Sequence, residues 1–292
     1  MLSEIDLIFA IALAISWTCG TILNSSIIAV YLSDWKKGIN LGACDQIILT
    51  MGCNNLLLQW ILTLHLVAFR LYGLFVEVFL VAPVSLMLNF GISLSFWLTA
   101  WLSIYYCVKL VNFSSRFFIR LKREISTAVT YCIVGTIVTS FVIRLPIIWT
   151  MHKTTNQNLT RINSIFYDNI ALVSFNAVFI CFLPTIITSF SIGLSLMSLL
   201  KHVHKMKQNS SEFWNPQLKS HVKACGTMLL LLTVNLIFFL AIFLYSLLNR
   251  KAGATEKYVA WFIMMSDPSS QAIILLFGNA RLATAWSKFL FS

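Results

Sequence analysis

Four polar side chains inside long apolar stretches are the residues of this chain best placed for chemistry. Asp267 is the only acidic residue well inside such a stretch, and Asn24, Asn54 and Asn55 lie inside two others. Such groups are costly in lipid unless they face the interior of a helix bundle, where they commonly mark function. We predict that these four residues form a polar network that takes part in activation.

Three roles for Asp267 remain open at the level of sequence. Hydrogen bonds to the asparagines would lock helices together, whereas a switch linked to a proton or an ion would use the carboxylate charge. Direct contact with a ligand is the third role, although a site this deep is hard to reach.

Catalytic and metal-binding patterns find little support. The sequence contains neither His-Glu-X-X-His nor Gly-X-Ser-X-Gly, and Asp267 lacks the second aspartate that an aspartyl protease needs. The seven cysteines have no metal-ligand spacing. No lysine lies between Tyr258 and Asn279, which excludes a retinal Schiff base there. We therefore expect no enzymatic activity, no cofactor and no metal.

The elements that position these residues are membrane helices. The chain has 292 residues and is 59% hydrophobic and 11% charged, against roughly 45–50% and about 25% in soluble proteins. A bilayer-crossing helix needs about 20 apolar residues, and seven segments qualify, at about 6–32, 47–69, 79–109, 127–150, 170–200, 224–248 and 258–279. The prediction is an all-α bundle of seven transmembrane helices in one domain.

The distribution of basic residues predicts the orientation of the bundle. One set of connections, at 33–46, 109–126, 201–223 and 280–292, holds fourteen lysines and arginines, and the opposite set holds seven. The richer set belongs inside, so we expect the N-terminus outside and the C-terminus inside. Because these charges lie at the ends of apolar segments, the net charge of +11 indicates membrane topology and not a nucleic-acid partner.

Aromatic residues gather toward the outer halves of several predicted spans, where helix bundles build ligand sites from facing side chains. Interfacial tryptophan belts are the alternative, and Trp149 and Trp261 could be such anchors. The candidate ligand-binding residues are Trp60, Trp97, Trp101, Asn176, Phe238 and Trp261.

Ordered motifs run through nearly the whole chain. Trp97 is followed by Leu-Ser-Ile-Tyr-Tyr at 102–106, Val-Lys-Leu-Val-Asn-Phe-Ser at 108–114 and Phe-Ile-Arg-Leu-Lys at 118–122. Further motifs are Leu-Gln-Trp at 58–60, Leu-Pro at 183–184, Ser-Leu-Leu-Lys-His at 198–202, His-Val-Lys-Ala at 221–224, Pro-Ser at 268–269 and Ile-Ile-Leu-Leu-Phe-Gly-Asn at 273–279. The third span lacks Asp-Arg-Tyr and the seventh lacks Asn-Pro-X-X-Tyr, unlike rhodopsin-like receptors. Together, the motifs closely resemble the type 2 taste receptors, the bitter receptors among the G-protein-coupled receptors.

The resemblance implies a plasma-membrane receptor whose ligands, small bitter compounds, enter from outside between spans three, five, six and seven. Trp97 matches the family's pocket tryptophan, Phe238 aligns with an aromatic switch, and Trp261 occupies a position that varies with ligand choice. On the inner side, the resemblance implies contact with a heterotrimeric G protein of the gustducin or inhibitory type. The residues expected to face it are Lys109, Arg120, Lys122, Arg123, Lys201, His202 and His221.

The polar centre departs from the family pattern. Asn55 stands where the family has an arginine, Gln271-Ala272 where it has His-Ser, and Asp267 where tyrosine is common. Such divergence suits a receptor far from the mammalian members. Two alternatives stay open: a vomeronasal type 1-like pheromone receptor, and a transporter or channel.

Asn158 begins the sequon Asn-Leu-Thr in a predicted outside loop, which predicts a glycosylation site there. Replacing Asn158 with Gln should remove one glycan from the protein expressed in animal cells. The check is a gel shift on glycosidase treatment, present for the wild type and absent for the variant. A wild-type chain whose mobility does not change would show that the site is unused.

Overall fold

The computed structural model describes residues 4–72, 74–111, 116–143, 178–208, 216–248 and 254–290. In these ranges the chain is mainly helical and contains no strand. The helices are α1 (Glu4–Lys36), α2 (Ala43–Tyr72), α3 (Leu74–Leu110), α4 (Arg116–Val142), α8 (Leu183–Gln208), α9 (Pro216–Leu248), α10 (Ala254–Gly278) and α11 (Ala280–Leu290), and the π-helical turn η2 (Val178–Phe182) precedes α8. Within the described part, seven helices are long and apolar enough to cross a membrane, which confirms the predicted all-α membrane bundle.

Several helices run beyond the predicted spans. The helix α4 begins at Arg116, eleven residues before the predicted start, so Arg120, Lys122 and Arg123 lie on a helix and not in a loop. No glycine or proline interrupts the sequence there, and basic residues are good helix formers. The helix α9 starts at Pro216, because proline at the first helical position has no intrahelical donor to lose.

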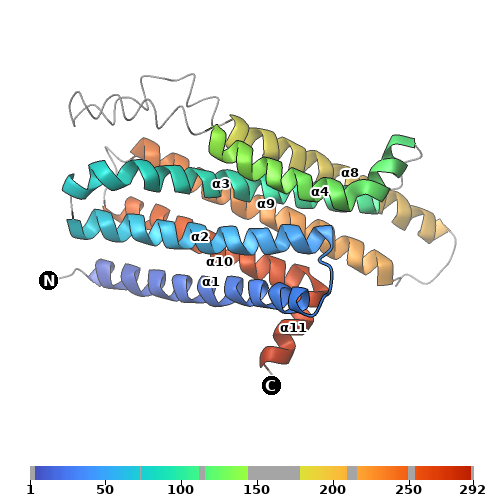
Figure 1. The fold of residues 1–292 in the computed structure, drawn as a ribbon, viewed down its shortest axis with the longest axis horizontal. Coiled ribbons are helices and arrows are strands. Elements are labelled where there is room, and N and C mark those ends of the chain that lie inside the picture. The colour runs from blue at the N-terminus through green and yellow to red at the C-terminus, as the bar shows by residue number, and fades with distance from the viewer. Residues whose placement is uncertain are drawn as a thin grey trace.

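The helix α3 lies at the centre of the bundle. It packs against α2, α4, α8 and α9, while α1 packs against α2 and α10, and the long helices run alongside one another in Figure 1. Buried apolar side chains such as Tyr31, Leu98 and Leu275 join α1, α3 and α10 in the largest core cluster. A Cβ atom at Gly91 would lie 2.6 Å from Leu58 Cδ2, so this glycine allows α2 and α3 to approach closely.

The turn after α1 depends on a left-handed glycine. Gly38 has a φ of 77°, which glycine adopts at little cost. Its N–H donates to Trp35 O at 2.9 Å, and the N–H of Ile39 donates to Asp34 O at 3.1 Å. These bonds satisfy carbonyls at the end of α1 and turn the chain toward α2.

The helix α11 was not predicted, because residues 280–292 were assigned to a loop. It leaves the bundle crosswise to α10 (Figure 1). Asn279 caps it, since Asn279 Oδ1 accepts hydrogen bonds from the N–H groups of Arg281 at 2.9 Å and Leu282 at 3.4 Å. Its apolar face is anchored by Leu282, which is buried, and by Trp286, which packs against the main core cluster.

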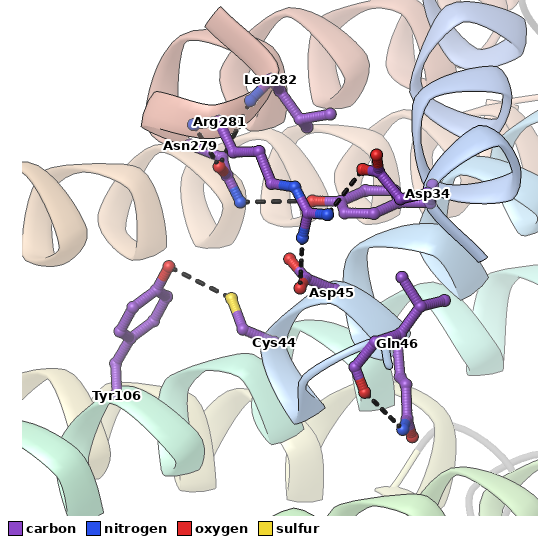
Figure 2. Close-up of polar contacts among 10 residues, drawn as sticks. Asp34, Cys44, Asp45, Gln46, Tyr106, Asn279, Arg281 and Leu282 are labelled. Carbon is purple, nitrogen blue, oxygen red and sulfur yellow. Dashed lines mark hydrogen bonds and ion pairs between the residues drawn. The ribbon is translucent and has the colours of Figure 1, made fainter. Parts of the chain in front are cut away.

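Arg281 ties the start of α11 to the ends of two other helices (Figure 2). Its Nη2 lies 2.6 Å from Asp34 Oδ2 at the end of α1, and its Nη1 lies 2.9 Å from Asp45 Oδ2 at the start of α2. The guanidinium also lies 5.7 Å from the centre of the Tyr31 ring, and Asn279 Nδ2 donates to Tyr31 Oη at 3.3 Å. We call Asp34, Asp45 and Arg281 the inter-helix clamp, because one planar cation holds two carboxylates from different helices.

We expect Arg281→Ala to lower the free energy of unfolding by about 1–2 kcal/mol, because both half-buried carboxylates lose their charged donor. The measurement is the Tm of the purified protein in detergent. Arg281→Lys should recover only part of the loss, since one ammonium cannot place two parallel donors as the guanidinium does.

Lys288→Ala is the matched control, because Lys288 is an exposed basic residue on the same helix. An equal change in Tm for Lys288→Ala and Arg281→Ala would contradict the role given to the clamp.

Candidate ligand-binding and activation site

Trp97 joins the middle of α3 to the π-helical turn η2 that precedes α8. Its indole Nε1 donates a hydrogen bond to Phe179 O in η2 at 3.2 Å. Its ring lies 5.3 Å from the Phe179 ring and 6.0 Å from the Trp101 ring. Single π-helical turns often occur at functional sites. The three rings, which we call the Trp97 cluster, give α3 an aromatic surface beside η2.

Trp101 belongs to this cluster but is anchored on its other side. Its Nε1 donates to Thr136 Oγ1 on α4 at 2.9 Å, and that hydroxyl donates in turn to Cys132 O at 2.7 Å. The indole is therefore fixed between α3 and α4, and only its stacked face is shared with Trp97.

Phe238 and Trp261 lie in a separate cluster between α9 and α10. They are 1% and 8% exposed and pack with Leu62, Met264 and Met265. The Trp261 ring lies 5.4 Å from the imidazole of His65 on α2. The structure thus distributes the predicted aromatic residues over two groups, one beside η2 and one between α2, α9 and α10.

Trp60 lies apart from the other aromatic residues predicted to bind ligand. Its side chain is 55% exposed on the outer surface of α2, and its ring packs edge-on against Trp17 at 5.0 Å. A large apolar side chain on the outside of a membrane bundle meets lipid. Trp60 therefore does not join the interior residues expected to line a ligand site.

A row of phenylalanines that sequence reasoning left out links the helices around the Trp97 cluster. Phe96 on α3 packs edge-on against Phe239 on α9 at 6.3 Å, and Phe182 of η2 packs against Phe239 at the same distance. The sequence carries little evidence for these three residues, because the chain has 23 phenylalanines. Only the three-dimensional structure distinguishes them from the others.

The predicted asparagines form hydrogen bonds between three helices. Asn24 Nδ2 donates to Gly20 O at 2.9 Å and to Pro268 O at 3.1 Å, and Asn55 Nδ2 donates to Asn24 Oδ1 at 3.2 Å. Together Asn24 and Asn55 connect α1, α2 and α10 inside the bundle. Both side chains are buried, at 0% and 1% exposed.

Asn54 connects α2 to α3 and does not bond to Asn24 or Asn55. Its Nδ2 donates to Gly91 O on α3 at 3.0 Å, where the glycine already allows close packing. The nearby Gln59 joins α2 to α1 by donating from Nε2 to Trp17 O. Asn54 and Gln59 therefore hold α2 against its two neighbours through backbone carbonyls.

Asp267 does not bond to the asparagines, contrary to the helix lock considered above. Its Oδ2 accepts from Gln271 Nε2 at 2.9 Å, one turn further along α10. Gln271 Nε2 also lies 2.9 Å from Ser95 Oγ and 3.0 Å from Asn235 Oδ1. The amide has two hydrogens for these three acceptors, so its bonds can exchange among α3, α9 and α10.

Ser95, Asn235 and Gln271, with Asp267, form what we call the acceptor-rich cluster. Ser95 Oγ lies 3.3 Å from both Asn235 Oδ1 and Gln271 Oε1, and Asn235 Nδ2 donates to Thr99 Oγ1 at 2.9 Å. Asn235 was missed, although it is the only asparagine in the apolar segment 224–248. A single amide in such a segment is the signal that could have found it.

The basic residues expected to face a partner collect at one end of the bundle, where α11 lies. Five of them have exposed side chains there: Lys109, Arg120, Lys122, Arg123 and Lys201. His221 is half-buried. His202 lies on α8, outside the residues whose side chains are described. Lys109 Nζ donates to Tyr105 Oη at 3.1 Å. Asn158 and Asn176 lie outside the described residues.

Comparison with known proteins gives one consistent family. The family model described as "Taste receptor protein (TAS2R)" matches residues 1–292. The chain is similar to the human putative taste receptor type 2 member 33, with 30% identity over 97% of this chain and 93% of that one. It is also similar to the human taste receptor type 2 member 46, at 30% identity with the same coverage of 97% and 93%.

A third relative is the taste receptor type 2 member 30 of Pongo pygmaeus, with 30% identity over 97% of this chain and 90% of that one. The family match covers the whole chain, and seven helices of the described part can cross a membrane. The chain therefore belongs to the type 2 taste receptor family, and it is a multi-pass membrane receptor.

Proposed function

We propose that this chain is a bitter taste receptor of the plasma membrane, which binds small bitter compounds from outside and activates a heterotrimeric G protein. The observation that carries the proposal is the Trp97 cluster, at the position that matches the family's pocket tryptophan. The ligand site would be bordered by α3, η2, α9 and α10, with Trp97, Trp101, Phe238 and Trp261 as its aromatic residues. Trp60 faces outward, and Asn176, which lies outside the described residues, stays a prediction from the sequence.

The orientation belongs to the same proposal. In it, the N-terminus is outside and the C-terminus, after α11, is inside. Support comes from the basic residues at the α11 end of the bundle, because positive residues are retained on the cytoplasmic side. The same charges would also attract anionic lipid. A G protein of the gustducin or inhibitory type would then meet the surface around Lys109, Arg120, Lys122, Arg123 and Lys201.

The acceptor-rich cluster would connect ligand binding to the inner surface. Ser95 lies two residues before Trp97 on α3, so a ligand that shifts Trp97 also shifts the hydroxyl that bonds Gln271 and Asn235. A ligand changes the populations of two helix arrangements only by its difference in affinity for them. Exchange of the Gln271 amide among its three acceptors would provide alternative arrangements of α3, α9 and α10 for a ligand to select.

The function is tested by expressing the chain with a promiscuous G protein and recording calcium responses to a panel of bitter compounds. At least one compound should evoke a dose-dependent response that disappears without the G protein. A ligand-evoked current that persists without any G protein would support a transporter or channel and reject the proposal.

Trp97→Ala should abolish the response to an agonist or lower its potency at least tenfold, because the variant loses the ring and the bond to Phe179 O. Trp97→Phe keeps most of the ring contact and loses only the donor, so its potency should fall by less. Surface labelling checks that both variants reach the membrane. An unchanged dose–response curve for Trp97→Ala would reject the pocket role.

Asn235→Ala should change agonist potency or basal signalling by about three- to tenfold, because it removes the α9 amide that bonds to Thr99 and Ser95 on α3 and to Gln271 on α10. Thr188→Ala is the matched control: Thr188 is equally buried, but its hydroxyl bonds only to Pro184 O in its own helix, at 2.7 Å. Equal effects of the two substitutions would show that the cluster has no part in coupling.

A further inference from the structure

A crevice of about 170 Å³ lies between α9 and α10, away from the Trp97 cluster. Its lining includes Ile237 and Phe238 on α9 and Phe262 and Asp267 on α10. Ile237 is 50% exposed and Phe262 is 41% exposed, so the crevice opens on the outer surface of the bundle. In a membrane this opening meets the lipid, because Asp267 lies near the middle of α10.

The carboxylate at this crevice has no balancing charge among the described residues. Asp267 is 3% exposed, its Oδ2 accepts one hydrogen bond from Gln271, and its Oδ1 has no hydrogen-bond partner. A buried carboxylate without a paired charge is costly. A positively charged group bound in the crevice would therefore supply the charge that Asp267 lacks.

The polar atoms around the crevice are suited to a ligand that only donates. The Ser266 hydroxyl donates to Phe262 O at 2.7 Å and the Ser270 hydroxyl donates to Ser266 O at 2.9 Å. Both hydroxyl hydrogens are thus used within α10, and the lone pairs of the oxygens remain. With Asp267 they present acceptors only, and an ammonium group has donors only.

We propose that this crevice is a second small-molecule site, which takes compact lipophilic amines in their protonated form and pairs their ammonium with Asp267. The apolar walls would hold the hydrocarbon part of the amine. An inorganic cation fits less well, because hard cations take six or more oxygen ligands and most of this lining is apolar. The volume is below the roughly 300–1,000 Å³ of drug-sized sites, so the ligand is a compact one. The crevice shares Phe238 with the proposed outward-facing site but opens on the outer surface of the bundle beside Ile237 and Phe262. The inference goes beyond the proposed function and does not depend on G-protein coupling.

The test uses the purified full-length protein in lipid nanodiscs and two probes of matched shape, 1-aminoadamantane and 1-adamantanol. We expect the wild type to bind the amine at least tenfold more tightly than the alcohol. The ammonium makes a charged hydrogen bond to the Asp267 carboxylate, which is stronger than the neutral hydrogen bond of the alcohol. Asp267→Asn should weaken amine binding about tenfold and change alcohol binding less than twofold. Equal binding of the two probes, or a preference for the amine that survives in Asp267→Asn, would overturn the proposal.

Further variants locate the amine even if Asp267→Asn folds poorly. Phe262→Trp should narrow the opening and weaken amine binding severalfold, whereas Trp97→Ala should change it less than twofold. Glu124→Gln removes a carboxylate that is exposed and remote, and it should have no effect. Loss of amine binding in Trp97→Ala with retention in Phe262→Trp would assign the amine to the outward-facing pocket and reject the crevice. Stabilisation by sodium chloride without any amine binding would reject it as well.

Discussion

The constraint on which this bundle depends is that the N–H groups of side-chain amides within lipid need acceptors from the protein. Backbone groups are satisfied by the helices themselves, so the side-chain amides are free to join one helix to another. Asn24, Asn55 and Gln271 do this at three junctions. Because lipid is as apolar as leucine, such bonds and close contacts, and not apolar burial alone, select which helices are neighbours.

The same constraint explains the position of α3. It receives a hydrogen bond at Gly91 O from α2, sends one from Trp101 to α4, and shares Ser95 with α9 and α10. A helix bonded on so many sides cannot move without changing several partners. The central helix is therefore the element best suited to transmit a change from one face of the receptor to the other.

The sequence was sufficient for the fold and for the interior positions of four polar residues. Apolar length alone predicts membrane helices, and the types of Asn24, Asn55 and Asp267 marked them as interior. The partner of Asp267 could not be derived from the sequence. Both faces of a membrane helix are apolar, so the sequence does not show which face of α10 points toward which neighbouring helix. The outward position of Trp60 could not be derived for the same reason, since its ring is as suitable for lipid as for a pocket. The short helix α11 was missed, although Asn279 followed by Leu282 and Trp286 is typical of a capped helix with one apolar face.

Trp97, Trp101, Tyr105 and Lys109 recur every four residues along α3. An α-helix turns through about 100° per residue, so these side chains form a stripe that winds about 120° around the helix axis from Trp97 to Lys109. The stripe begins against η2, contacts α4 at Trp101 and ends at the exposed basic surface. A small rotation of α3 would therefore change its contacts with η2, with α4 and with the basic surface at different depths in the membrane. A rotation at the aromatic end of the stripe would move the charged side chain of Lys109 sideways at the other end.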